Sequence, residues 1–332
     1  MRRISKIFAS FLLSGALGLV AQSPFEVTIR VPVRLVNVPT LVFSKDGRIL
    51  PDLQRTDFRV FDNGQPQQVA LETAAMPVSI VLAVQLNEDV RAYVPFIAKA
   101  GSSVDTLLVG ETGESAVIAY SDDISLLKPF EAGDVQSALK VIPAHGTHAR
   151  MIDAGVRAIA LLKQRPSSRT RVLIFIGQAM DSGSETGMDF LKEQAERENV
   201  AIYALALPQF GKAFVSDTFS LQGLSSSSDK GGFKAGVDLG KLISVLIRRS
   251  KAEKSVDPFS ILTAATGGTQ LHFRKSKEFE DAIAMIGMEL RSVYQLNYYP
   301  GSAEGGYHRI RIEVNVRGAT AYNRPGYWLG TN

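Results

Sequence analysis

The stretch Ser79-Ile80-Val81-Leu82-Ala83-Val84-Gln85-Leu86-Asn87-Glu88-Asp89-Val90 decides how the rest of the chain is interpreted. It opens on an apolar run, follows Pro77 and turns abruptly into a polar loop. Such a run is typical of a parallel strand that is buried on both faces of a sheet. Ligands of open α/β sheets bind outside the carboxyl ends of the strands, so we look for binding or chemistry in the loop at 85–89.

Composition sets the class of protein. The chain has 332 residues and 45% hydrophobic content, enough for a full core, and its length favours two domains. It contains no cysteine. Disulfides, zinc–thiolate sites, thiol catalysis and a lipid anchor on cysteine are therefore excluded.

The amino terminus has the pattern of an export signal. Arg2, Arg3 and Lys6 precede an apolar run at 7–20, and small residues suitable for cleavage follow. A retained membrane anchor is the alternative, but the run is shorter than the roughly 20 residues that span a bilayer. We expect a signal peptide at 1–22, a periplasmic or secreted protein, and no membrane span in the mature chain.

Charge argues against nucleic acid as a partner. The net charge of +4 includes the three basic residues of the signal, which leaves 4 − 3 = +1 for the mature chain. A protein with so little positive charge lacks the electrostatic attraction on which nucleic-acid binding depends.

The middle of the chain alternates apolar runs with amphipathic segments. The runs predict strands at 79–84, 115–120, 171–177, 200–207 and 269–273, with an antiparallel edge strand at 124–130. Helices are predicted between them at 90–108, 132–142, 188–198, 257–266 and 279–294. Another follows the loop at 144–148, has Ile152, Val156, Ile159 and Leu162 on one face, and is closed by Pro166. This order predicts a doubly wound, mostly parallel α/β sheet. The less regular segment at 208–255 is expected to be an insertion, with a helix at 237–249.

Both ends of the chain have the alternation of half-buried strands. Strands are expected at 25–38, 40–43, 58–61 and 69–72, and at 293–299, 307–316 and 320–327 after the α/β part. Neither terminal piece has enough strands to be stable alone. We expect them to form one small β-sandwich from residues 23–74 and 294–332, with the α/β domain at 75–293.

Two motifs carry a family resemblance that covers nearly the whole mature chain. One is Asp57-Phe58-Arg59-Val60-Phe61-Asp62-Asn63-Gly64-Gln65-Pro66, and the other is Arg324-Pro325-Gly326-Tyr327 near the carboxyl end. Together with the strand and loop at 79–90, they resemble von Willebrand factor A-type domain proteins of the bacterial secreted VWFA-related family, acidobacterial type. The resemblance implies a von Willebrand A domain with a Rossmann-like fold.

The resemblance also implies a site. In the family, Asp-x-Ser-x-Ser after the first strand, a Thr from a second loop and an Asp from a third hold a divalent cation. Here these positions are Gln85, Asn87, Asp89, Thr147 and Gln178, so two carboxylates have become amides. Asp181 lies three residues past Gln178 and is the nearest replacement. The comparison predicts a degenerate metal-ion-dependent adhesion site, with no cofactor; weak Mg²⁺ binding is the alternative.

The sequence contains few of the motifs that are typical of enzymes. His145 and His148 flank Thr147, but no HExxH arrangement accompanies them, and His272 and His308 stand elsewhere. The chain has no G-x-S-x-G elbow and no GxGxxG after a strand. We expect a non-catalytic, metal-independent interaction module of adhesion or scaffold type. Its partner would be an envelope or extracellular protein docking at Gln85, Asn87, Asp89, Thr147, Gln178 and Asp181. A hydrolase-like enzyme using His145 or Asp181, and weak cation-dependent adhesion, are the alternatives.

Overall fold

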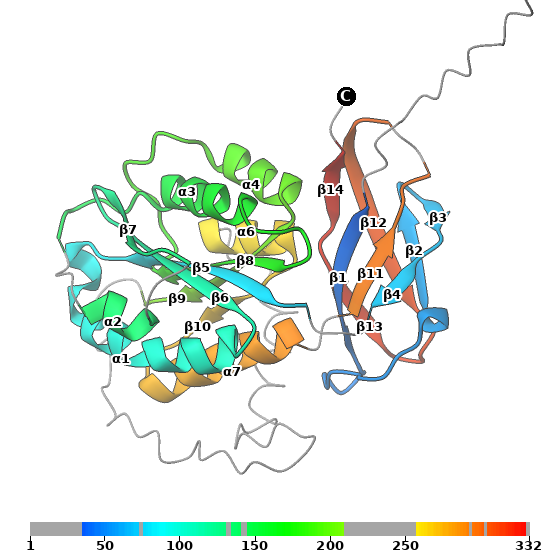
Figure 1. Ribbon diagram of the computed structural model, residues 1–332, viewed down its shortest axis with the longest axis horizontal. Helices are drawn as coiled ribbons and strands as arrows, with labels where there is room; N and C mark the ends of the chain where they lie inside the picture. The colour runs from blue at the N-terminus through cyan, green and yellow to red at the C-terminus, as the bar shows by residue number, and fades with distance from the viewer. Residues whose placement is uncertain are drawn as a thin grey trace, which may run out of the picture. The chain divides into compact units, whose positions relative to one another are not determined.

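The structure is a computed structural model that describes residues 35–72, 76–130, 134–140, 145–208, 257–291, 294–301 and 304–329 (Figure 1). The signal peptide expected at 1–22, the first part of the strand expected at 25–38, and the insertion with its helix at 237–249 lie outside these residues. Within the described part, no helix is long and apolar enough to cross a membrane.

A six-stranded sheet forms the α/β part. Its order is β10 (Gln270–His272), β9 (Val200–Ala206), β8 (Thr170–Gly177), β5 (Val78–Gln85), β6 (Glu114–Tyr120) and β7 (Ile124–Lys128). All neighbours run parallel except β7, which pairs antiparallel with β6 at one edge. Every residue of β5 is buried, because β6 and β8 flank it and helices cover both faces. The doubly wound fold expected from the sequence is confirmed.

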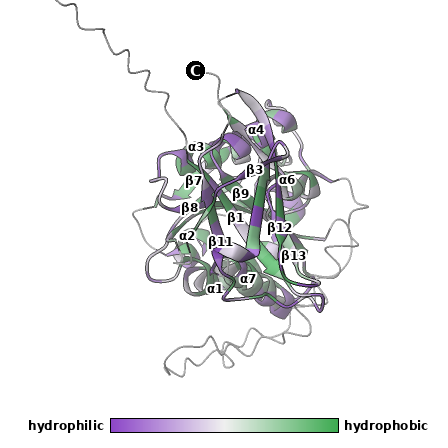
Figure 2. Ribbon diagram, turned by 90° about the vertical axis from the view of Figure 1, so that its right-hand side faces the viewer, coloured by the Kyte–Doolittle hydropathy of each residue, from purple (hydrophilic) through white to green (hydrophobic). Residues whose placement is uncertain are grey.

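The helices divide between the two faces of this sheet (Figure 1). Along β5, Ile80, Leu82 and Val84 point into a core with α1 (Val94–Val104), α2 (Val135–Lys140) and α7 (Ser276–Arg291). Val81 and Ala83 point the other way, into a core with α3 (Met151–Lys163), α4 (Met188–Arg197) and α6 (Pro258–Thr266). Alternate side chains of a strand face opposite sides, so one apolar run feeds two cores. Figure 2 shows both hydrophobic and hydrophilic residues on α3 and α4, as expected of helices that bury one side.

One predicted helix is broken into three pieces. Residues 90–108 were expected as a single helix, but a 3₁₀ turn at Glu88–Tyr93 comes first, then α1, then a π-helical turn at Asp105–Val109. Pro95 lies in the first turn of α1. Proline has no N–H to donate, which is tolerated at the start of a helix but not inside it, so the regular helix begins here.

The strands of the two termini form two four-stranded sheets. The first has the order β13 (Thr320–Asn323), β1 (Val36–Phe43), β11 (Tyr294–Tyr298) and β4 (Ala70–Glu72). The second has β14 (Gly326–Leu329), β12 (Gly306–Val314), β2 (Phe58–Asp62) and β3 (Gln65–Gln67). Val38 pairs with Leu296 and Val60 with Ile312, so each sheet contains strands from both termini. The small β-sandwich built from both termini is confirmed.

The last predicted strand is two strands. Residues 320–327 alternate as a single strand would, but β13 ends at Asn323 and pairs with β1, whereas β14 starts at Gly326 and pairs with β12. Arg324 and Pro325 lie between them. Pro325 has no N–H for a ladder hydrogen bond, and its carbonyl instead accepts one from the amide of Ile310. The chain therefore changes sheets at the proline.

Candidate functional site

The candidate site lies where the order of the strands reverses. β5 and β8 are neighbours in the sheet, but their connections leave in opposite directions, one toward β6 and the other toward β9. Such a reversal opens a crevice at the carboxyl ends of the two strands. Gln85 is the last residue of β5, and Gln178 follows the last residue of β8.

Amide side chains bridge this crevice. The Oε1 atom of Gln85 accepts a hydrogen bond from the backbone N–H of Gln178 at 2.7 Å. Its Nε2 atom donates to Oδ1 of Asn87 at 2.9 Å, and Nδ2 of Asn87 donates to Oδ2 of Asp89 at 3.0 Å. We call these four residues the amide relay. It ties the end of β5, the loop after it and the end of β8 together through hydrogen bonds.

Burial divides the amide relay into an inner and an outer part. Gln85 and Asn87 are 0% exposed and Gln178 is 6% exposed, whereas Asp89 is exposed. The side chains of Gln85 and Asn87 therefore support the crevice from below, and a macromolecular partner can touch Asp89 but not them.

The loop that carries Thr147 lies directly against the loop after β5. The amide of His145 donates to the carbonyl of Leu86 at 2.8 Å, and the amide of Glu88 donates to the carbonyl of Gly146 at 3.0 Å. Thr147 itself is exposed, and its hydroxyl lies 3.4 Å from Nδ1 of His148. The loop thus stands at the crevice, as the sequence predicts.

Asp122 holds this loop in place. One of its carboxylate oxygens accepts the backbone N–H groups of Thr147 at 3.1 Å and His148 at 2.7 Å, and lies 2.8 Å from Nδ1 of His148. The hydrogen bonds from His148, its amide first, lower the pKa of Asp122. Asp122 follows the carboxyl end of β6, so the rule that loops there line the crevice could have singled it out from the sequence.

Asp181 has a different role from that of a cation ligand. Its Oδ1 atom accepts the backbone N–H of Ile152 at 2.9 Å and the hydroxyl of Ser184 at 2.7 Å. Ile152 is in the first turn of α3, whose amide groups have no partner within the helix. Asp181 therefore fastens the loop after β8 to the start of α3.

Tyr120 closes the floor of the crevice. It is fully buried, and its hydroxyl has no hydrogen-bond partner among the described residues. A Cβ atom on Gly177 would lie 2.5 Å from that hydroxyl and 2.7 Å from Oε1 of Gln85, so only glycine fits there. Burial raises the pKa of Tyr120, which keeps the phenol neutral. No sequence pattern indicated this contact, because it depends on the pairing of Gln85 with Tyr120 across β5 and β6.

The donor set does not suit a divalent cation of the magnesium class. Such ions need several hard, preferably anionic oxygens. In the amide relay the oxygens of Gln85 and Asn87 already accept hydrogen bonds, which leaves one carboxylate, that of Asp89. Across the described residues, no three His, Asp or Glu side chains gather in a way that could hold a metal ion.

The four histidines lie in three separate places. His145 and His148 are exposed at the crevice, and His272 ends β10. His308 is buried in the β-sandwich, where its Nδ1 lies 2.8 Å from Oδ1 of Asp62. Asp181, which the hydrolase alternative would use, accepts hydrogen bonds from the amide of Ile152 and the hydroxyl of Ser184.

Comparison with known proteins gives structural likeness only. No protein-family model matches the chain, and no curated protein matches it. Among solved structures, the conserved hypothetical protein BatB from Bacteroides thetaiotaomicron is 12% identical, with a TM-score of 0.41 over 65% of this chain and 100% of its own. A von Willebrand factor type A protein from Catenulispora acidiphila is 9% identical, with a TM-score of 0.46 over 90% of this chain and 74% of its own. The SpRpn10 VWA domain is 9% identical, with a TM-score of 0.37 over 62% of this chain and 93% of its own. At these levels the likenesses carry no argument, and the doubly wound α/β fold rests on the strand order of the chain itself.

Proposed function

We propose that the chain is an exported protein-interaction module of the von Willebrand A type, which docks a protein partner at the rim of the crevice without a metal ion. The amide relay is the observation that carries this proposal. It makes the connections between β5, its loop and β8 through hydrogen bonds, where a cation-dependent site would make them through the ion.

Charge supports a metal-independent crevice. A dication must shed part of its hydration shell to bind, and anionic ligands offset that loss. Gln85 and Gln178 carry no charge, so Asp89 is the one anion of the five family positions. Weak cation-dependent adhesion would have to rest on this exposed carboxylate.

The partner would contact the outer part of the site. Asp89, Thr147 and His148 are exposed beside one another in the two loops that meet through Leu86, Glu88 and Gly146. Gln85, Asn87 and Gln178 would fix the positions of these loops from below. Loops positioned by a rigid sheet are the usual carriers of binding function.

Binding fits the site better than catalysis. Asp181 already accepts two hydrogen bonds that secure α3. A general base must be free to reach a substrate proton. Export to the periplasm or the medium rests on the residues at 1–22 and agrees with a chain that needs no disulfide.

Affinity capture from envelope extract tests the proposal. The mature protein should retain the same partner in EDTA and in magnesium. Thr147→Trp should abolish retention because the larger side chain blocks the rim, and Asp89→Arg should abolish it because the charge of the rim is reversed. Glu111→Arg is the matched control, because Glu111 is an exposed acid in the loop that leads into the opposite, amino-terminal end of β6. A partner that binds the rim variants as well as the unaltered protein, or that EDTA releases, would contradict the proposal.

A further inference from the structure

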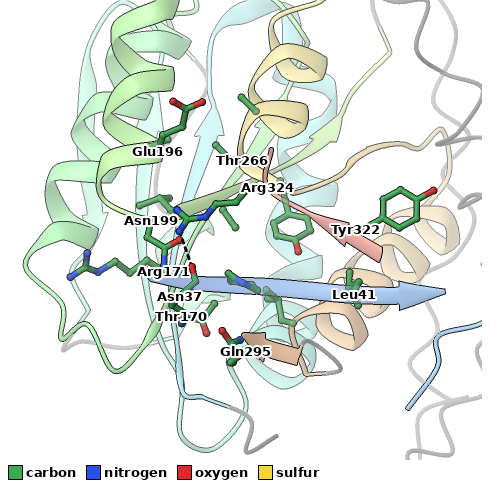
Figure 3. A pocket seen from close by; sticks show the side chains of 18 of the residues that line it. Asn37, Leu41, Thr170, Arg171, Glu196, Asn199, Thr266, Gln295, Tyr322 and Arg324 are labelled. Atoms are coloured by element: carbon green, nitrogen blue, oxygen red, sulfur yellow. Dashed lines mark hydrogen bonds between the residues drawn. The ribbon is translucent and has the colours of Figure 1, made fainter. Parts of the chain in front are cut away.

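A second polar hollow lies at the other end of the α/β sheet, where β8 begins. An inner cavity of about 50 Å³ is lined by Thr170 and Arg171 of β8 and by Asn37 and Gln295 of the β-sandwich (Figure 3). An outer cavity of about 590 Å³ adjoins it. The two share Asn37, Arg169, Arg171, Glu196, Asn199 and Arg324. The outer volume is within the usual range of small-molecule sites, roughly 300–1,000 Å³.

The strand register places three amide side chains on this hollow. Along β11, Tyr294, Leu296 and Tyr298 pack in the sandwich core, so Gln295 and Asn297 face the opposite side of the sheet. Asn37 of β1 is paired with Asn297, and Pro39 with Gln295. Three amides thus sit side by side on one sheet face, where apolar residues would suffice for packing.

These amides have oxygens without hydrogen-bond partners. Gln295 is 3% exposed and Asn297 is 6% exposed. Among the described residues, nothing donates to Oε1 of Gln295, to Oδ1 of Asn297 or to Oδ1 of Asn37. Gln295 lines the inner cavity, Asn297 lines the outer one and Asn37 lines both. Buried acceptors are unfavourable when unpaired, so their presence indicates a ligand that brings donors.

The charged residues around the outer cavity nearly balance. They are Arg169, Arg171, Arg197 and Arg324 against Glu72, Glu196 and Glu198, which gives 4 − 3 = +1. Most have partners already: Arg169 lies 3.1 Å from Glu114, Arg171 lies 3.7 Å from Glu198, and Arg197 lies 2.5 Å from Glu193. A dication would find no excess of negative charge, and a phosphate would find an excess of one positive charge among arginines that mostly have partners. The hollow therefore fits a neutral ligand.

We propose that this hollow binds a neutral saccharide of one to three units. Sugar hydroxyls donate to amide oxygens and accept from arginine N–H groups, and both kinds of group line the hollow. Trp328, which is half-buried, adds aromatic surface to the outer cavity for the C–H face of a sugar ring. The site is separate from the crevice at Gln85 and Gln178, which lies at the carboxyl ends of the same strands, and the inference does not depend on the proposed function.

The test is a binding titration of the full mature chain with maltose, cellobiose and N,N′-diacetylchitobiose, followed by calorimetry and by saturation-transfer NMR. We expect at least one of the three to bind, and Gln295→Met and Asn297→Leu each to weaken it by about tenfold or more, the loss expected when a buried polar partner is removed. Gln68→Met is the matched control, because Gln68 is exposed and does not line either cavity.

Thermal melting separates a lost contact from a lost fold. Both variants replace a buried amide with an apolar side chain of similar size, so their melting temperatures should equal or exceed that of the unaltered protein. Two results would overturn the proposal: no binding of any of the three sugars at millimolar concentration, or binding that stably folded Gln295→Met and Asn297→Leu retain in full.

Discussion

Asp62 joins four strands of the β-sandwich through its carboxylate. Oδ2 accepts the hydroxyls of Tyr298 at 3.0 Å and Tyr327 at 2.7 Å, while Oδ1 lies 2.8 Å from Nδ1 of His308. The other ring nitrogen of His308 lies 2.8 Å from the carbonyl of Glu304. The cluster connects β2, β11, β12 and β14.

Asp62→Asn should destabilise the protein strongly. An amide has one acceptor oxygen and adds two N–H donors where three donors converge, so at least one buried group would lose its partner. We expect the free energy of unfolding to fall by about 3 kcal/mol in urea titrations. Asp46→Asn is the control: Asp46 and Arg48 form an exposed pair at 3.5 Å, and its loss should change stability by less than about 0.5 kcal/mol. Equal effects of the two substitutions would show that the cluster adds nothing to stability.

The sequence predicts which residues form the candidate site, but it does not predict which of their side chains contact one another. The loop positions Gln85, Asn87 and Gln178 follow from the strand pattern and the resemblance. That Gln85 and Asn87 are sealed from solvent depends on the register of β5 with β6 and β8, which no local pattern encodes. Asp62 lies in one quoted motif and Tyr327 in the other, but their hydrogen bond spans 265 positions and was not foreseen.

The start of α3 illustrates how a loop is fixed to a helix. Asp153 accepts the amides of Glu185 and Thr186, each at 3.0 Å, and a 2.8 Å bond from Arg150. Burial opposes ionisation of Asp153, but hydrogen bonds from Thr186, Glu185 and Arg150 together outweigh it and lower its pKa to about 2. The loop after β8 is thereby held against α3 by an ionised carboxylate.

This carboxylate should make stability depend on pH in the acid range. Its pKa in the folded chain is depressed below the ordinary value of 3.8, so its contribution is present above about pH 4 and is lost as the pH falls through about 2. We expect Asp153→Asn to lower the free energy of unfolding at pH 7 by at most about 2 kcal/mol, and the two proteins to converge near pH 2. Urea titrations at a series of pH values measure both curves.

Asp189→Asn serves as the control for that series, because the side chain of Asp189 is fully exposed. Its curve should follow that of the unaltered protein throughout. A constant gap between Asp153→Asn and the unaltered protein from pH 7 to pH 2 would show that Asp153 acts through packing and not through its charge.

Helices and strands were predictable where burial imposes a regular pattern. The central strands β5 and β8 each contain an unbroken apolar run of five residues, and α4 matches its predicted range to one residue. The hydrophobic pattern gave wrong boundaries at two prolines, Pro95 in α1 and Pro325 between β13 and β14. In both places the missing N–H of proline decides where an element begins or ends.

Across the whole chain, the β-sandwich depends on both termini. β1 pairs with β11 and β13, β2 pairs with β12, and β4 pairs with β11, so three of the four described amino-terminal strands have a carboxy-terminal neighbour. Two-stranded pieces are marginally stable in water at best. The sandwich therefore cannot form until the α/β part, which separates its two halves in the sequence, has been synthesised.

Removing residues 294–332 should expose the amino-terminal strands. Limited proteolysis followed by mass spectrometry should then find new cleavage sites in residues 36–62, while the α/β sheet, whose six strands all lie outside the deletion, remains protected. Unchanged resistance of residues 36–62 would contradict the idea that the two ends depend on each other.

Metal titration of the unaltered mature protein tests the metal-independent crevice most directly. With Asp89 as the one carboxylate among the five family positions, calorimetry with magnesium or manganese should show no saturable binding, and about 10 mM of either ion should leave the melting temperature unmoved. A ligand of the folded state alone would raise stability by RT ln(1 + [L]/Kd). Gln85→Asp combined with Gln178→Asp should restore anionic ligands and some metal-dependent stabilisation, which shows that the assay can detect the ion. Saturable micromolar binding by the unaltered protein would contradict a metal-independent crevice, because a cation would then replace the hydrogen bonds of the amide relay.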